Sequence, residues 1–177
     1  MAFYESDVDV LIDTNTLQAR IRELGQQLTR EYQGKELTLI CVLKGSAFFA
    51  MDLARYVDLP LTIEFLGVSS YQGGTETTGE VRITTDVSKP MAGKHLLVIE
   101  DIIDTGLTMS FLLENLKARH PASVKVCSLL EKPARARTQV PIDYKGFGID
   151  DVFVVGYGLD YAERYRNLPF IGVMKGK

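Results

Sequence analysis

The chain has 177 residues, of which 46% are hydrophobic and 24% are charged, the balance of a globular protein of ordinary domain size. Its formal net charge of −3 argues against a broad surface for nucleic acid. Both cysteines lie in apolar runs too short to span a bilayer, and the acidic N-terminus lacks the features of a signal peptide, so we expect a cytoplasmic protein without a membrane partner.

The N-terminal part of the chain predicts a helix followed by a strand. Leucine and isoleucine recur at helical spacing over residues 14–32, which predicts an amphipathic helix capped by Asp13 or Thr14. The continuous apolar run at residues 37–43 predicts a buried strand. The chain is then expected to turn through Lys44-Gly45 into a second helix.

The composition changes after a second strand, which is predicted over residues 61–68. Residues 69–84 are polar and rich in glycine and threonine, and they have little to bury. They predict either a long flexible loop or a two-stranded flap. Long segments of this kind are often functional.

The second half of the chain continues the alternation of strands and helices. Strands are predicted over residues 95–99, 123–130 and 151–155, with a helix over residues 110–119. The remaining residues, 156–177, mix aromatic and charged side chains and are expected to fold back as an extra lobe. The pattern is typical of an α/β fold with a mostly parallel sheet, in which ligands bind at the carboxyl ends of the strands.

The loop Asp104-Thr105-Gly106-Leu107-Thr108 joins the strand at residues 95–99 to the helix that follows. Amides at a helix N-terminus bind anions, and Gly106 permits a tight turn, so the loop suits one phosphate monoester. A simpler interpretation is that Asp104 and Thr105 only cap the helix. The loop by itself supports the two interpretations about equally.

Two further acids, Glu100 and Asp101, directly follow the apolar run of the same strand. A cap several residues later does not require them. Paired carboxylates can accept hydrogen bonds from vicinal hydroxyls and can bind Mg²⁺ through oxygen. A phosphate site beside a diol site describes a ribose 5-phosphate, so these acids favour the phosphate interpretation of the loop.

The segment V-I-E-D-I-I-D-T-G-L-T-M at residues 98–109 resembles the phosphoribosyl pyrophosphate (PRPP) motif of type I phosphoribosyltransferases. Other segments resemble the hypoxanthine-guanine branch of that family, and together the matches cover residues 43–169 in order. These segments are Leu43-Lys44-Gly45, Ser70-Tyr71, Lys132 in LLEKPARAR, and residues 150–169. The resemblance implies the type I phosphoribosyltransferase fold in a single domain, residues 1–177. A core at about 35–155 would carry a hood formed by the N-terminal residues, about 156–177, and the flexible loop.

The resemblance also implies an activity in purine salvage. The family transfers the 5-phosphoribosyl group from PRPP to N9 of hypoxanthine or guanine, giving IMP or GMP and pyrophosphate. Mg²⁺ is the implied cofactor, and association into homodimers or homotetramers is expected. Two alternatives stay open. A relative that prefers xanthine or adenine would share the PRPP motif, and some proteins with this motif are RNA-binding regulators.

The resemblance assigns the sugar, phosphate and metal contacts to particular residues. The 5′-phosphate would be held by Asp104, Thr105, Gly106, Leu107 and Thr108. The ribose hydroxyls would be held by Glu100 and Asp101, and a Mg²⁺ ion bridging ribose and pyrophosphate would be bound at the same two acids. Asp160 would hold a second Mg²⁺ through water. Asp104 would in addition be the catalytic general base, facing N7 of the purine.

The remaining implied contacts concern pyrophosphate and the purine. Pyrophosphate would be bound by Lys44, Gly45 and Arg166. The purine would be bound by Lys132, Phe153, Val154 and Asp160, with Lys132 donating to O6 and Phe153 stacking on the base. Ser70 and Tyr71 would open the flexible loop that closes over the reaction. Without the resemblance, Lys132 and Arg166 would be expected to be solvated and Phe153 to be a core side chain.

Overall fold

The computed structural model describes residues 7–70 and 81–176; the side chain of Ser70 and all of Tyr71 lie outside the described part. The helices are α1 (Thr14–Glu31), α2 (Ala47–Arg55) and α3 (Leu107–Lys117), with a 3₁₀-helix at Pro133–Arg135. The strands are β1 (Val8–Ile12), β2 (Leu37–Leu43), β3 (Leu61–Ser70), β4 (Val81–Thr85), β5 (His95–Ile103), β6 (Ser123–Glu131), β7 (Tyr144–Gly148), β8 (Val154–Val155) and β9 (Ile171–Met174). Within the described ranges, no helix is long and apolar enough to cross a membrane.

The main sheet has six strands in the order β4-β3-β2-β5-β6-β7. Every neighbouring pair from β3 to β7 is parallel, and only β4 runs antiparallel, against β3. The predicted α/β class with a mostly parallel sheet is therefore confirmed. The β3–β4 pairing also shows that the described ends of the segment at residues 69–84 form the two-stranded alternative.

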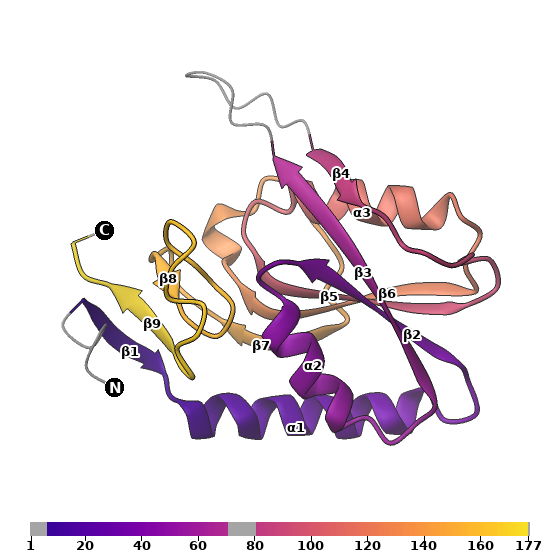
Figure 1. Ribbon diagram of the computed structural model, residues 1–177, viewed down its shortest axis with the longest axis horizontal. Coiled ribbons are helices and arrows are strands. Elements are labelled where there is room, and N and C mark those ends of the chain that lie inside the picture. The colour runs from indigo at the N-terminus through magenta and orange to yellow at the C-terminus, as the bar shows by residue number, and fades with distance from the viewer. Residues whose placement is uncertain (1–6, 71–80, 177) are drawn as a thin grey trace.

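Both faces of this sheet are covered by helices, which explains its continuous apolar strands (Figure 1). Alternate residues of a strand point to opposite faces. In β2, Leu39 and Cys41 pack in the same cluster as α1 and α2, whereas Ile40 and Val42 pack in the cluster of α3. The helical spacing predicted for residues 14–32 is borne out in α1, whose N-cap Asp13 accepts hydrogen bonds from the amides of Asn15 and Thr16.

A second, antiparallel sheet joins the two ends of the described chain in the order β1-β9-β8. Figure 1 shows β1 and β9 side by side at one end of the molecule. Val8, Val155 and Met174 of this sheet form a small apolar cluster, while Ile12, Val154 and Ile171 pack into the main core. The extra lobe expected at residues 156–177 therefore folds against the N-terminal strand, which the sequence did not predict as a strand.

The strand predicted over residues 151–155 is wrong as a member of the main sheet. Only Val154–Val155 is a strand, and it pairs with β9 in the small sheet. The place beside β6 is taken by β7, whose sequence YKGFG contains two glycines and does not look like a buried strand. The apolar residues at 151–155 have two roles: Val154 and Val155 are buried in the small sheet, and Phe153 is exposed at a pocket.

The close packing of α1 on α2 depends on Gly25 in the middle of α1. A Cβ atom at this position would overlap with Tyr56, the C-cap residue of α2. We expect Gly25→Ala to lower the free energy of unfolding by about 1–3 kcal/mol, because overpacking outweighs the better helix propensity of alanine. Chemical denaturation measures the change, and Gln26→Ala on the exposed face of α1 is the control. A more stable Gly25→Ala variant would contradict the tight contact.

Candidate active site

The candidate site lies where β5 continues beyond its neighbour β2. Pairing between the two strands ends at Cys41 and Ile99, whereas β5 stays paired with β6 as far as Ile103. Glu100 and Asp101 therefore lie inside a longer strand, and the predicted end at residue 99 is wrong. The acids nevertheless lie at the carboxyl end of the sheet, on the part of β5 that no longer pairs with β2.

The loop after β5 leads directly into α3, which begins three residues earlier than predicted. Gly106 is the N-cap residue, with a φ of 80°, and the cap makes no side-chain hydrogen bond. The interpretation that Asp104 and Thr105 only cap the helix is therefore wrong. A cavity of about 120 Å³ lies at the start of α3. Its lining residues include Glu100, Asp104, Thr105, Gly106 and Thr108.

A backbone loop packed beneath Gly106 holds this turn in place. The carbonyl of Thr105 accepts hydrogen bonds from the amides of Arg137 and Thr138, at 3.0 and 3.1 Å. A Cβ atom on Gly106 would overlap with the carbonyl oxygen of Thr138. The glycine is therefore required both for its left-handed backbone and for this close approach.

Glu100 and Asp101 are adjacent carboxylates in a partly buried position. Burial raises the pKa of Glu100 well above its ordinary value, and the neighbouring charge of Asp101 raises it further. Burial likewise raises the pKa of Asp101, although hydrogen bonds and the charge of Arg166 oppose the shift. The Oε2 atom of Glu100 is buried without a hydrogen-bond partner among the described residues. Such a group is suited to a ligand or an ion that neutralises it.

Lys44 and Gly45 lie beside these acids, at the turn between β2 and α2. The peptide bond between Leu43 and Lys44 is cis. A Cβ atom on Gly45 would overlap with the carboxylate of Asp101, so the glycine lets the turn approach the acid closely. A Cβ atom on Gly158 would in turn overlap with the carbonyl oxygen of Gly45. Three segments far apart in the sequence thus meet without intervening side chains.

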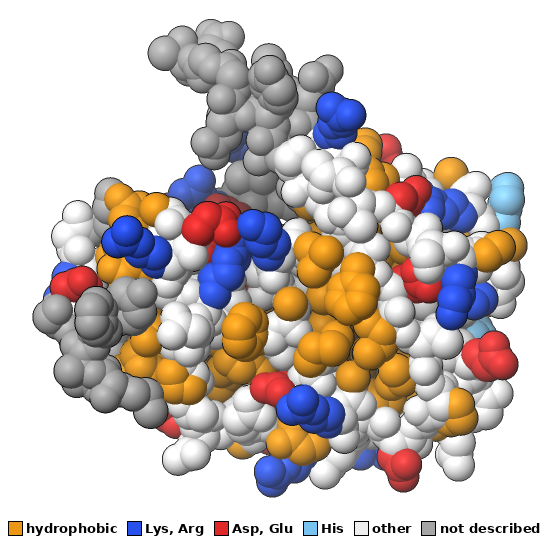
Figure 2. Space-filling view, in the orientation of Figure 1, with side chains coloured by type: hydrophobic (Ala, Val, Ile, Leu, Met, Phe, Trp, Pro, Cys, Tyr) orange, Lys and Arg blue, Asp and Glu red, His pale blue; other side chains and the backbone are white. Residues whose placement is uncertain are grey.

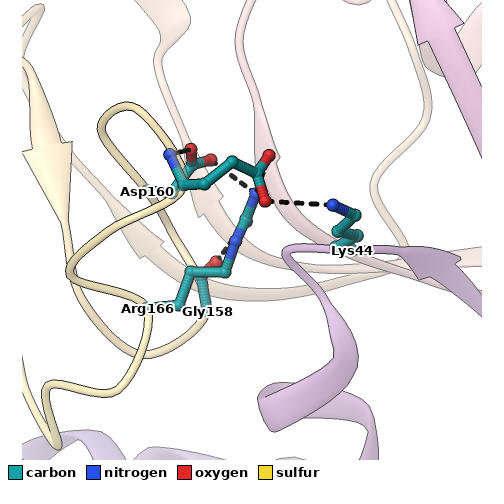
Figure 3. Close-up of polar contacts among 5 residues, drawn as sticks. Lys44, Gly158, Asp160 and Arg166 are labelled. Atoms are coloured by element: carbon teal, nitrogen blue, oxygen red, sulfur yellow. Dashed lines mark hydrogen bonds and ion pairs between the residues drawn. The ribbon is translucent and has the colours of Figure 1, made fainter.

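Arg166 reaches the same place from the C-terminal lobe. Its Nη1 donates to the carbonyl oxygen of Gly158 at 2.7 Å, and its Nη2 lies 2.8 Å from Asp160 Oδ1. Figure 3 shows Lys44 and Arg166 approaching one region from separate segments. The structure therefore brings together the three residues predicted for pyrophosphate, and the expectation that an isolated Arg166 is solvated is wrong.

A second pocket, of about 450 Å³, adjoins the loop after β5. It unites the four residues predicted for the purine, Lys132, Phe153, Val154 and Asp160, with Asp101 and Asp104. Lys132 is only 7% exposed, so it is not the solvated lysine expected from its type alone. Phe153 is 40% exposed at the pocket and is not a core side chain. Val154 is buried in the small sheet beside it.

One pocket residue, Arg135, was missed by the sequence reasoning. Its Nε lies 2.7 Å from Asp104 Oδ1, although the N–H direction is not that of a hydrogen bond. Its Nη1 contacts Asp151, which also lies 3.6 Å from Lys132 Nζ. The only signal in the sequence was the basic run after Lys132, and such runs are usually solvated. The 3₁₀-helix at Pro133–Arg135 turns this arginine toward the pocket.

The sequence matches the family model described as phosphoribosyl transferase domain over residues 8–162. The bifunctional protein TilS/HprT of Listeria monocytogenes is 51% identical over 94% of this chain. The chain spans only 26% of the length of that relative. The hypoxanthine-guanine phosphoribosyltransferase of Mycobacterium avium is 47% identical, and the match covers 97% of this chain and 88% of the relative.

The fold agrees with a solved relative over almost its whole length. The crystal structure of a hypoxanthine phosphoribosyltransferase from Staphylococcus aureus superimposes with a TM-score of 0.94 at 46% sequence identity. The superposition covers 98% of this chain and 95% of that one. The expected type I phosphoribosyltransferase fold is thereby confirmed.

Proposed function

This chain belongs to the phosphoribosyl transferase domain family, and from that premise we propose that it transfers the 5-phosphoribosyl group of PRPP to N9 of hypoxanthine or guanine. The products are IMP or GMP and pyrophosphate. The observation that carries the proposal is the pocket that joins Asp101 and Asp104 to Lys132, Phe153 and Asp160. The similarity to the Mycobacterium avium enzyme supports the same substrates.

The sugar phosphate is proposed to bind along the end of β5 and the start of α3. The free amides of the first turn of α3, with the hydroxyls of Thr105 and Thr108, suit a dianionic phosphate. Glu100 and Asp101 would accept hydrogen bonds from the ribose hydroxyls. Lys44, Gly45 and Arg166 would stabilise the pyrophosphate as it gains charge on leaving C1′.

The acids beside the sugar site fit a Mg²⁺ ion that is shared with the substrate. The described residues contain no group of three or more potential protein ligands, and Glu100 has a buried oxygen without a partner. Mg²⁺ commonly takes only one or two carboxylates and fills its other positions with phosphate oxygens and water. The bound ion would neutralise charge on the departing pyrophosphate. Both oxygens of Asp160 are already engaged, by Arg166 and by the amide of Glu163, so a second ion there would bind through water.

The purine is proposed to lie in the pocket of about 450 Å³, between the sugar site and the small sheet. Lys132 would donate a hydrogen bond to O6, and the half-exposed ring of Phe153 would stack on the base. The backbone of Val154 and Asp160 would meet the N1 and C2 edge. Asp104 would face N7, where a carboxylate stabilises the positive charge that develops on the base or removes its proton.

The proposed activity is tested by a panel of bases with PRPP, in the presence and absence of Mg²⁺, followed by ultraviolet absorbance. Hypoxanthine and guanine should be converted, whereas adenine should react little because its amino group cannot accept a hydrogen bond from Lys132. Omitting Mg²⁺ should abolish turnover. Adenine as the best substrate would contradict the assignment of the base.

An RNA-binding function is the second candidate, but the charge distribution does not favour it. On the face in Figure 2, Lys and Arg side chains stand beside Asp and Glu side chains, and the described residues there form no continuous basic surface. Retention of labelled RNA at physiological salt, together with no turnover of any base, would reverse the preference.

The protein is further proposed to act in the cytoplasm as a homo-oligomer of two or four copies. Apolar side chains gather over the middle of the face in Figure 2. Phe48 of α2 and Phe65 of β3 are among the exposed large hydrophobic residues, and exposed apolar surface of this kind often marks an interface. Light scattering coupled to size-exclusion chromatography measures the mass in solution and distinguishes a monomer from a dimer or a tetramer.

A further inference from the structure

The carboxylate of Glu163 lies between Lys44 and Arg166. Its Oε2 accepts a hydrogen bond from Lys44 Nζ at 3.0 Å, and its Oε1 lies 3.4 Å from Arg166 Nη2. Each oxygen of one anion thus faces one of the two cations proposed for pyrophosphate.

The hydrogen bonds of the Arg166 guanidinium are only partly satisfied by the described residues. The guanidinium is fixed on one side by Gly158 and Asp160, while its Nε is buried and has no hydrogen-bond partner among the described residues. The side chain of Lys44 is 69% exposed and that of Glu163 is 67% exposed. A ligand can therefore reach Lys44 from solvent, and the exposed side chain of Glu163 can turn away from Arg166, whose own side chain is 22% exposed.

The backbone of the C-terminal lobe directs Glu163 to this point. Tyr161 and Arg164 exchange two backbone hydrogen bonds, which close a tight turn around Ala162 and Glu163. Both residues of the turn have positive φ, 51° and 63°. The amide of Glu163 also donates to Asp160 Oδ2 at 2.8 Å. The turn is therefore tied to the same aspartate that fixes Arg166.

We propose that Glu163 is an internal anion that occupies the pyrophosphate position in the ligand-free enzyme and must be displaced when PRPP or pyrophosphate binds. The inference rests on the proposed function. Glu163 is ionised at neutral pH, because the hydrogen bond and the charge of Lys44 lower the pKa of its carboxyl. A negative group that competes for Lys44 and Arg166 weakens the binding of another anion there. It thereby sets the affinity for PRPP and favours release of pyrophosphate.

The competing interpretation is that Glu163 holds the two cations in the geometry that pyrophosphate needs. The two interpretations predict effects of opposite sign. If Glu163 competes, removing its charge strengthens anion binding, whereas if it only positions Lys44 and Arg166, removing its charge weakens anion binding. Because the Lys44–Glu163 pair is largely exposed on both sides, either effect is expected to be moderate.

The test is Glu163→Gln in the full chain, titrated with magnesium pyrophosphate by calorimetry. We expect roughly three-fold to ten-fold tighter binding, because the ion pairs of Glu163 with Lys44 and Arg166 no longer compete with the ligand. Product inhibition by pyrophosphate should strengthen by the same factor, and the KM for PRPP should fall. The difference from the unaltered enzyme should shrink as salt is added, because the competing interaction is electrostatic.

Glu23→Gln is the matched control. Glu23 pairs with Arg20 three residues away on α1, just as Glu163 stands three residues from Arg166, and its side chain is 64% exposed. The variant removes the same charge from a helix outside the site and should leave pyrophosphate affinity unchanged. Equal or weaker binding by Glu163→Gln would overturn the inference. The proposed function fails separately, if the unaltered chain does not transfer the phosphoribosyl group to any base.

Discussion

Replacing Asp104 with asparagine should lower kcat by about two to four orders of magnitude and leave PRPP binding largely intact. Asp104 lies where the phosphate cavity and the purine pocket meet, because it lines both. The proposed phosphate contacts at this loop come from amides and hydroxyls, which the substitution keeps. The carboxylate itself is needed only when the purine becomes positively charged or loses its proton. Because PRPP binding and the chemical step depend on different groups of the loop, we expect the substitution to affect kcat alone.

The measurement is steady-state kinetics with hypoxanthine, together with a direct titration of PRPP. Asp104→Asn also breaks the ion pair with Arg135, so a second variant has to separate the two causes. Arg135→Ala removes the same ion pair but keeps the carboxylate, and its kcat should fall far less. An unchanged kcat in Asp104→Asn would exclude Asp104 as the base. An equal loss of kcat in both variants would show that the ion pair between Asp104 and Arg135, and not the carboxylate as a base, accounts for the effect.

Neutralising the two acids of β5 should make the protein more stable and a poorer binder of PRPP. We expect the double variant Glu100→Gln, Asp101→Asn to lose about two orders of magnitude in PRPP affinity. Hydrogen bonds to charged groups contribute about 1.5–3 kcal/mol each, and the shared Mg²⁺ would lose its carboxylates. The gain in stability and the loss of affinity have one cause. Burial makes the two carboxylates costly in the free protein, and the same carboxylates bind the ligand.

The effect of this double variant on stability depends on pH. Both carboxyls have a pKa raised from ordinary values of 4.5 for Glu100 and 3.8 for Asp101. The folded protein therefore holds its protons more tightly than the unfolded chain, and stability falls as pH rises from these values through the raised pKa of each group. Neutral amides carry no such penalty. The melting temperature of the variant should exceed that of the unaltered protein at pH 8, and the gap should narrow toward pH 4.

Thermal unfolding across this pH range and calorimetric titration of PRPP check the two halves of the prediction. Glu131→Gln, at the carboxyl end of the neighbouring strand β6, is a control for loss of one carboxylate, which pairs with Lys145. It should change neither the pH dependence nor PRPP affinity appreciably. A double variant that is less stable at pH 8 would show that Glu100 and Asp101 support the fold, and unaltered PRPP affinity would contradict the ribose assignment.

Much of the fold could be predicted because its cause is local. The apolar runs of β2 and β6 and the helical spacing of α1 are properties of short segments, and the structure places these elements within a residue of their predicted bounds. The segment of β7 could not be found in this way. Its glycines oppose a strand, and it pairs with β6 only because the sheet leaves an edge there. The strand predicted over residues 151–155 was wrong for the opposite reason. These residues are apolar because they pack in the small sheet and line a pocket, and they do not belong to the main sheet.

The sequence by itself determined which groups stand at the carboxyl end of β5, because acids, glycine and threonines follow one another along a single strand and loop. Only the tertiary structure decided which distant groups meet them. Arg135 reaches Asp104 through a 3₁₀-helix after β6, and Glu163 reaches Lys44 from a turn 119 residues away. Neither residue differs by type from a solvated surface charge. Its partner is set by how the loops and the C-terminal lobe pack on the sheet, and that packing depends on contacts that no short segment contains.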